Sequence, residues 1–134
     1  MAKYENLPIY RKAMELLVYI EQTVKNFPRY HKYAIGARMR NTVFEVTSLI
    51  VKANNNADRA ERTMLLTKLR DTSEEVKICL NAARELQAFN SFNSYNHAAR
   101  LAVDICRQSE GWLGSSRKTP LPESYPRQEN EARP

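Results

Sequence analysis

Glycine is scarce in this sequence, and its scarcity narrows the fold class. Only Gly36, Gly111 and Gly114 occur among 134 residues. Turn-rich β architectures and glycine-rich phosphate loops both depend on glycine, so neither fits this chain. Ala, Leu, Glu, Lys and Arg are abundant instead, and these residues have high helix propensities. The composition therefore predicts an all-α protein.

Cysteine is even rarer than glycine. Cys79 and Cys106 are the only two, and both fall on apolar faces of expected helices, where a thiol packs as a small hydrophobic group. Core packing is therefore favoured over a disulfide or a metal site. A chain of this length can form a hydrophobic core without either.

Long apolar runs are missing. The opening residues, MAKYENLPIY, contain no hydrophobic segment of a signal peptide, and the run from Leu16 to Ile20 is too short to span a bilayer. We therefore expect a cytoplasmic protein without membrane association.

Residue sets that support catalysis are also missing. No Glu-x-x-His pair is present to build a di-iron site in a helical bundle, and no Walker loop, G-x-S-x-G, H-E-x-x-H or C-x-x-C motif occurs. His97 is expected to be solvated or to cap a helix. His31 is expected in a loop, although Arg29 and Lys32 beside it leave a phosphate contact open. The sequence thus indicates no enzyme, cofactor, metal or small-molecule substrate.

Four amphipathic segments account for residues 1–114. Apolar residues recur at three- and four-residue steps in each segment, as on one face of a helix, and proline- or asparagine-containing connections separate the segments. The expected helices span about 8–27, 33–53, 57–89 and 94–113. Their short connections predict an antiparallel up-down-up-down four-helix bundle. Residues 115–134, rich in proline, serine and charge, are expected to be a disordered tail.

The segment 33–53 is apolar on two faces. Its main stripe consists of Ile35, Met39, Val43, Val46 and Ile50. The second stripe, on roughly the opposite side, consists of Tyr33, Ala37, Phe44 and Val51. One bundle cannot cover both faces of a helix. The second stripe therefore predicts an interface with another copy of the chain.

Positive charge exceeds negative charge. The chain contains 21 Lys and Arg against 15 Asp and Glu, a formal net charge of +6, which favours acidic partners such as nucleic acid. The expected apolar seam of segment 57–89 consists of Leu65, Leu69, Val76, Leu80, Ala83 and Leu86. Basic residues are expected on one side of this seam: Arg59, Arg62, Arg70, Lys77 and Arg84. Asp71, Glu74 and Glu85 are expected on its other side.

This basic row extends about 35–40 Å at the helical rise per residue and could match phosphates along a nucleic-acid backbone. Two other interpretations stay open. The row can be an ordinary solvated helix face, or it can meet the acidic side of a neighbouring subunit in a ring. The aromatic residues Phe89, Phe92 and Tyr95 at the next turn are expected to pack in the core rather than to stack on bases.

Several segments resemble one protein family. They are LPIYRKAMELL (7–17), FPRYHKYAIGARMR (27–40), ANNNADRAER (53–62), LNAARELQAF (80–89) and GWLGS (111–115). They resemble the accessory variability determinants (Avd) of diversity-generating retroelements, a four-helix-bundle group related to rRNA intervening-sequence and ribosomal-protein-like proteins. The most specific parts are Phe27, Pro28, Lys32, Tyr33, Gly36 and Arg38, together with the terminal GWLG.

The resemblance implies a homopentameric, positively charged barrel that binds RNA or DNA and a reverse transcriptase and supports mutagenic retrohoming without catalysis. Among the basic residues, Lys32, Arg38 and Arg40 match the family position by position. The basic row on segment 57–89 is predicted from residue spacing alone and not from the resemblance. Contact by shape is expected, because no base-reading module is recognisable. The alternative is a structural or rRNA-associated four-helix-bundle protein with no polymerase partner.

Overall fold

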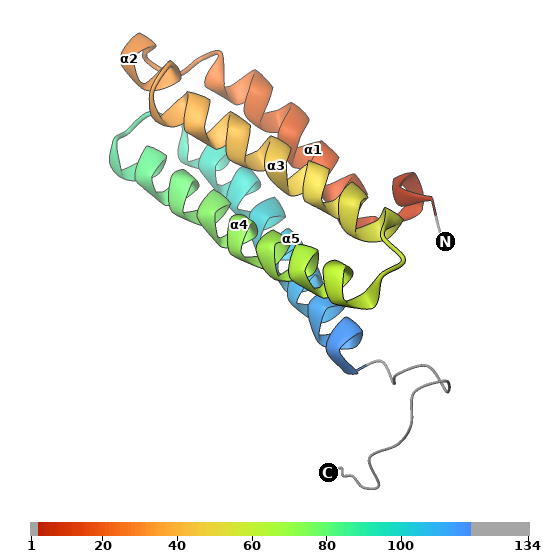
Figure 1. Cartoon of the computed structure of the whole chain (residues 1–134). Coiled ribbons are helices and arrows are strands. Elements are labelled where there is room, and N and C mark those ends of the chain that lie inside the picture. The colour runs from red at the N-terminus through yellow and green to blue at the C-terminus, as the bar shows by residue number, and fades with distance from the viewer. Residues whose placement is uncertain (1–2, 119–134) are drawn as a thin grey trace, which may run out of the picture.

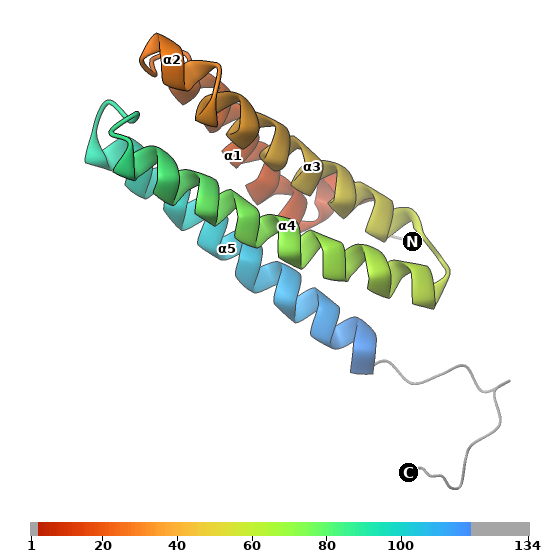
Figure 2. The same cartoon turned by 60° about the vertical axis from the view of Figure 1, so that its left-hand side comes forward.

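The computed structural model describes residues 3–118, with only the backbone of Lys118, as a bundle of four long helices (Figures 1 and 2). These are α1 (Pro8–Val24), α3 (Ile35–Asn55), α4 (Arg59–Glu85) and α5 (Phe92–Lys118). A 3-10 turn, η1 (Tyr4–Asn6), precedes α1, and the short helix α2 (Arg29–Lys32) links α1 to α3. The described residues contain no strand, so the expected all-α class is confirmed.

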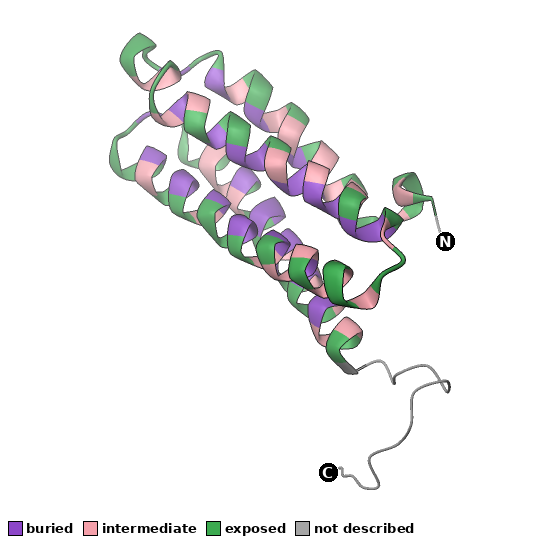
Figure 3. Ribbon diagram, viewed as in Figure 1, coloured by how far each residue is buried: buried purple, intermediate pink, exposed green. Residues whose placement is uncertain are grey.

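Each long helix packs against two neighbours. α3 lies between α1 and α4, and α5 packs against α4 and α1. The link through α2 and the α4–α5 connection lie at one end of the bundle, and the α3–α4 connection lies at the other (Figure 1). Buried residues face the inside of the bundle along all four helices (Figure 3). Because the α2 link and the α4–α5 connection share one end of the bundle, segments that are distant in sequence lie close together there (Figure 1).

The core follows the helical periodicity of the sequence. Each long helix contributes apolar residues with almost no exposed surface, including Leu16 of α1, Ile50 of α3, Leu69 of α4 and Ile105 of α5. Met39, Val43, Val46 and Ile50 are buried at the positions expected for the main stripe of segment 33–53, and Leu16 and Ile20, four residues apart, are buried in α1. A full side chain of this kind stabilises the fold by roughly 1.5–3 kcal/mol when it leaves water.

The expected seam of α4 is wrong at two positions. Leu66, not Leu65, is fully buried, and Leu65 packs only partly against the core. Leu86 is 49% exposed, because α4 ends at Glu85 rather than at Phe89. Gln87 has a φ of 57°, and the N–H groups of Gln87 and Ala88 donate to the carbonyls of Arg84 and Ala83. This Schellman arrangement closes the helix and turns Leu86 outward.

The second expected helix is interrupted. α2 ends at Lys32 with Tyr33 as its C-cap, and Ala34 has non-helical angles of φ −110° and ψ −96° before α3 begins at Ile35. His31 therefore lies within a short helix and not in a loop. α1 ends three residues before the expected Phe27, and the N–H groups of Asn26 and Phe27 donate to carbonyls three residues back, which tightens the chain ahead of Pro28.

The last helix is longer than expected. α5 continues through Gly114 to Lys118, so the expected disorder is wrong for residues 115–118, and residues 119–134 lie outside the described part of the chain. Two contacts hold this extension against α4. The hydroxyls of Thr63 and Ser116 are 3.1 Å apart, and Arg59 donates to the carbonyl of Arg117 at 3.3 Å.

Both cysteines are buried free thiols, as the sequence predicts. Burial raises the pKa of Cys79, and it raises the pKa of Cys106 from 9.0 to about 11, with the Glu74 carboxylate adding to the effect. Both groups therefore remain neutral thiols near neutral pH. A neutral buried thiol is a poor nucleophile and a poor metal ligand.

The raised pKa of Cys106 makes stability pH-dependent. A raised pKa in the folded state favours folding below the unfolded value of 9.0, and this contribution is lost as pH rises through about 11. We expect the free energy of unfolding, measured by urea denaturation, to fall less steeply from pH 9 toward 11 in Cys106→Ala than in the unsubstituted protein. The comparison removes the shared titration of lysines and tyrosines. Equal slopes would contradict this expectation.

Gly36 lies where the start of α3 meets the end of α1. A Cβ atom at this position would be 2.8 Å from Cγ1 of Val24 and 3.0 Å from the carbonyl oxygen of His31. Phe27 lies 3.4 Å away on the same side. Since all three neighbours belong to the α1–α2 corner, only glycine permits this close approach.

We expect Gly36→Ala to destabilise the protein by about 1–2 kcal/mol, because overpacking outweighs the better helix propensity of alanine. Gly111→Ala is the matched control. Gly111 lies within α5, and a Cβ atom there would extend into open space, with no neighbouring element within 4 Å. The same change should therefore stabilise by about 0.5–1 kcal/mol. Urea denaturation of both variants measures whether each substitution lowers or raises the free energy of unfolding. A stabilising Gly36→Ala would show that the α1–α3 contact relaxes freely.

Candidate nucleic-acid interface

The eight candidate cations lie on two parts of the bundle. Lys32, Arg38 and Arg40 belong to α2 and the first turns of α3. The other five lie along α4, and two of them reach α5. Arg59 donates to the carbonyl of Arg117, and the guanidinium of Arg84 lies 4.9 Å from the centre of the Tyr95 ring. The α4 row therefore runs beside the α4–α5 contact.

Three cations of the α4 row are paired with carboxylates. Arg70 contacts Asp71 at 3.1 Å, Lys77 contacts Glu74 at 3.4 Å and Arg84 contacts Glu85 at 3.8 Å. The expected separation of basic and acidic sides is therefore wrong. Neighbouring positions on a helix are only about 100° apart, and long basic side chains bend across that angle.

The pairing reduces the positive potential of the row without removing it. Exposed ion pairs of this kind stabilise a protein by only about 0–1 kcal/mol, so a phosphate can displace the carboxylate. However, each cation that binds a phosphate in this way loses its ion pair with the neighbouring carboxylate. The row is consequently a weaker attractor of polyanions than its spacing suggests.

Arg62 and Arg59 have local structural roles. Arg62 donates from Nε to the carbonyls of Ala53 and Asn56, each at 3.1 Å, and from Nη2 to the carbonyl of Asn54 at 3.4 Å. It thereby satisfies carbonyls at the C-terminal end of α3, where a cation is also favoured by the helix dipole. Arg59 makes a similar bond at the end of α5. Helical spacing alone gave no sign of these roles.

A carboxylate-free segment lies at the α2 end of the bundle. From Gln22 to Phe44 the sequence contains no Asp or Glu. It does contain Lys25, Arg29, Lys32, Arg38 and Arg40. Arg40 is paired with Glu21 across the α1–α3 contact at 2.9 Å. Within residues 3–118, the other four have no carboxylate within ion-pair distance, so this segment has more unneutralised positive charge than the α4 row.

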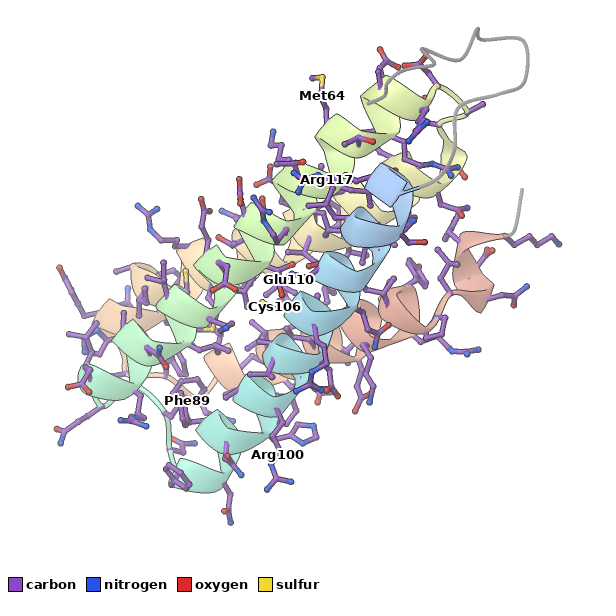
Figure 4. All side chains as sticks on the ribbon, turned by 90° about the horizontal axis from the view of Figure 1, so that it is seen from below. Met64, Phe89, Arg100, Cys106, Glu110 and Arg117 are labelled. Carbon is purple, nitrogen blue, oxygen red and sulfur yellow. The ribbon has the colours of Figure 1, made fainter. Side chains whose placement is uncertain are left out.

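A second carboxylate-free stretch adjoins the first. No Asp or Glu occurs from Leu86 to Val103, which includes the α4–α5 connection and the start of α5. Phe27 and Phe89 join the two stretches, with their rings 5.2 Å apart in an edge-to-face contact. Arg100 and Phe89 lie toward the same end of the molecule, and Arg117 and Met64 toward the other (Figure 4). We call the end formed by residues 25–38 and 86–100 the basic end.

The basic end was not fully recognised from the sequence. Lys25, Arg29 and Arg100 were not among the candidate residues, although all three are exposed. The signal was present as long gaps between acidic residues, one after Glu21 and one after Glu85. The spacing of charges along one helix does not reveal this end, because the two gaps are far apart in sequence and meet only in the fold.

The aromatic residues near this end differ in exposure. Phe89 and Tyr95 pack against the core as expected, with their rings 5.7 Å apart. Phe92 is 64% exposed, so the expectation of core packing is wrong for this residue. Phe92 is the first residue of α5, and its ring lies 5.8 Å from the ring of Tyr95.

The histidines are surface residues in the structure. His97 is exposed, lies 3.9 Å from a carboxylate oxygen of Glu15 and contacts the ring of Tyr19 edge-on. This agrees with the expected solvated role. His31 is half-buried beside the ring of Tyr30.

The second stripe of α3 faces away from the core. Phe44 is 65% exposed, and Ala37 and Val51 are half-buried. Tyr33 precedes α3, so helical spacing does not place it in this stripe. The centre of its ring lies 5.9 Å from the guanidinium of Arg29 and 6.0 Å from the ammonium of Lys32.

The described residues lack two further kinds of feature, a metal site and a membrane-spanning helix. Residues 3–118 contain no group of three or more His, Cys, Asp or Glu side chains arranged to hold a metal ion. Among the helices described, none combines the length and apolarity needed to cross a membrane.

Comparison with known proteins assigns the family. No curated protein sequence matches the chain. A family model described as bAvd-like matches residues 7–116, which include all four long helices except the last two residues of α5. The match covers the segments in which the sequence resembles Avd proteins and the whole of the basic end. The chain therefore belongs to the bAvd-like family.

Proposed function

We propose that this Avd-type accessory protein binds the template RNA or cDNA of a diversity-generating retroelement, together with its reverse transcriptase, and supports mutagenic retrohoming without catalysing a reaction itself. Family membership supports the accessory role. The observation that supports nucleic-acid binding is the carboxylate-free segment 22–44, in which Lys25, Arg29, Lys32 and Arg38 have no carboxylate partner among the described residues. The proposal assigns the protein to the cytoplasm.

Phosphate contacts supply the binding energy in this proposal. Each neutralised phosphate releases condensed counterions, so affinity falls as salt rises. The proposed contact residues are Lys32, Arg38, Arg40, Arg59, Arg62, Arg70, Lys77 and Arg84. We expect Lys32 and Arg38 to contribute most to binding, because neither has to break an ion pair with a carboxylate or a hydrogen bond to a carbonyl before it contacts a phosphate. The contact is independent of base sequence.

We further infer an up-down-up-down topology and a homopentamer. The alternation of the connections between the two ends of the bundle supports the topology. The exposed ring of Phe44, with Ala37 and Val51 on the same face, supports a subunit interface. Tyr33, which the sequence also predicts in this interface, precedes α3 and lies at the basic end. A ring of subunits would present several basic ends to one nucleic acid, and linked contacts of this kind raise the overall affinity.

A structural or rRNA-associated protein without a polymerase partner is the second candidate. The ion pairs along α4 favour it, since paired charges are typical of a helix face that is simply solvated. Co-purification with the products of neighbouring genes separates the two candidates. Recovery of a reverse transcriptase supports the first, and recovery of ribosomal particles without a polymerase supports the second.

Two charge reversals of equal size test the nucleic-acid contact. Lys32→Glu with Arg38→Glu removes two unpaired cations, and Arg70→Glu with Lys77→Glu removes two paired ones. We expect the first pair to weaken binding of a labelled RNA roughly tenfold more than the second, and to lower the slope of log affinity against log salt by about two. Fluorescence anisotropy at several salt concentrations measures both quantities.

Both variants alter the net charge equally, so a nonspecific charge effect would weaken them alike. Equal losses of RNA affinity in the two variants would contradict a special role of Lys32 and Arg38 in binding. A complete lack of RNA and DNA binding by the unsubstituted protein at low salt would refute nucleic-acid binding itself.

A separate pair of variants tests the subunit interface. Phe44→Lys with Val51→Lys places two charges on the outer face of α3, where burial against a second copy would be strongly unfavourable. We expect light scattering to show single chains of 15.5 kDa with unchanged helical circular dichroism. Met64→Lys with Ile78→Lys is the control, because both residues are exposed on α4. An unchanged mass for the α3 variant would rule out this interface.

A further inference from the structure

Exposed aromatic rings are concentrated at the basic end. Among the described residues, four aromatic side chains are exposed, namely Tyr30, Tyr33, Phe44 and Phe92. Three of the four belong to the basic end. Tyr30 is 79% exposed and Tyr33 is 68% exposed. Aromatic rings elsewhere in the bundle pack at least partly against other residues, so this concentration is a feature of one end only.

Two cations lie beside the Tyr33 ring without covering it. The guanidinium of Arg29 and the ammonium of Lys32 lie 5.9 and 6.0 Å from the centre of the Tyr33 ring, which is the outer limit of a cation–π contact. Most of the ring surface is therefore accessible. Both cations also lack a carboxylate partner within residues 3–118, and they can turn to a phosphate beside the ring.

The aromatic residue next to the α4 row provides a contrast. The Tyr95 ring lies under the guanidinium of Arg84 at 4.9 Å, and its hydroxyl donates to Asn81 at 2.8 Å. Phe89 and Phe92 contact the same ring. Tyr95 is thus already occupied, and the α4 row offers charge without a free aromatic surface.

We propose that the basic end binds unpaired nucleotides of a single strand. Tyr30 and Tyr33 stack on bases, and Arg29 and Lys32 contact the adjoining phosphates. In a duplex both faces of each internal base are covered by neighbouring bases, so an exposed ring adds affinity only for bases that are unstacked. This inference rests on the proposed function and names the form of nucleic acid that the basic end selects.

The structure also suggests how the two basic surfaces divide their roles. The basic end combines exposed rings with cations that have no carboxylate partner among the described residues, which is the combination used by proteins that bind single strands without sequence preference. The α4 row offers cations without exposed rings: three of the five are paired with carboxylates, and the other two donate to backbone carbonyls. A nucleic acid with both paired and unpaired regions would place its unpaired nucleotides at the basic end.

A strand without bases provides the decisive probe. Four labelled probes of about 12 nucleotides are compared by anisotropy at low salt: oligo(dT), oligo(rU), an abasic strand with the same number of phosphates, and a duplex. We expect the strands with bases to bind roughly tenfold more tightly than the abasic strand. The dT and rU arms show whether DNA or RNA is preferred.

Substitution of the tyrosines assigns the effect to the basic end. Tyr30→Ala with Tyr33→Ala should abolish the difference between oligo(dT) and the abasic strand, and Tyr30→Phe with Tyr33→Phe should preserve it, because phenylalanine still stacks. Tyr4→Ala, at the opposite end of the bundle, should leave the difference unchanged. Circular dichroism and light scattering of each variant check folding and oligomeric mass. Tyr30→Ala alone should cause part of the loss, since Tyr30 belongs to no proposed subunit interface.

The outcomes distinguish this inference from the function on which it rests. Equal binding of oligo(dT) and the abasic strand, or an unchanged difference in the double alanine variant, overturns base stacking at the basic end while salt-dependent nucleic-acid binding stands. No binding of any probe overturns both. Tighter binding of the duplex than of either single strand overturns the preference for unpaired nucleotides.

Discussion

The close packing of α3 against the end of α1 at Gly36 determines the geometry on which the basic end depends. The absent side chain lets Val24 and the carbonyl of His31 approach the α3 backbone, so α2 is folded back across the end of the bundle. The ring of Phe27, part of the same corner, contacts Phe89 of the α4–α5 connection. One small residue thereby brings together two segments that contain no carboxylate.

The distribution of carboxylates matters more for function than the number of cations. Along α4 the acidic residues lie within reach of the basic ones, and most of the charge is satisfied locally. At the basic end no acidic residue is available in either segment, so Arg29 and Lys32 stay unneutralised by the described part of the chain. An electrostatic field with little local compensation attracts a polyanion over a longer distance and loses less on binding it.

The bundle separates its structural and its binding residues by position. Arg62 and Arg59 tie the ends of α3 and α5 to α4 with hydrogen bonds to carbonyls, which uses two cations for stability. Tyr30 and Tyr33 contribute little to the core, and they lie in α2 and at its C-cap. A short linking helix can change its outer residues with little effect on the core, and it is therefore a suitable place for a binding surface on a bundle of fixed architecture.

Helix content, the positions of the core and the family could be read from the sequence, because each depends on local patterns: the spacing that buries Leu16 and Ile50, and the motif that includes Gly36. The carboxylate gaps were equally visible, but their meeting at one end was not. Only the tertiary structure decided which cations pair, that Arg62 caps α3, that α4 closes at Gln87, and that Tyr33 leaves the stripe of α3. The capping of α3 by Arg62 and the pairing of Arg40 with Glu21 depend on which side chains from separate helices come within a few ångströms of one another, and the period of a single helix contains no information about that distance. The ion pairs of α4 and the turn at Gln87 are local, but they depend on side-chain rotamers and on a positive φ, which the spacing of apolar residues does not specify.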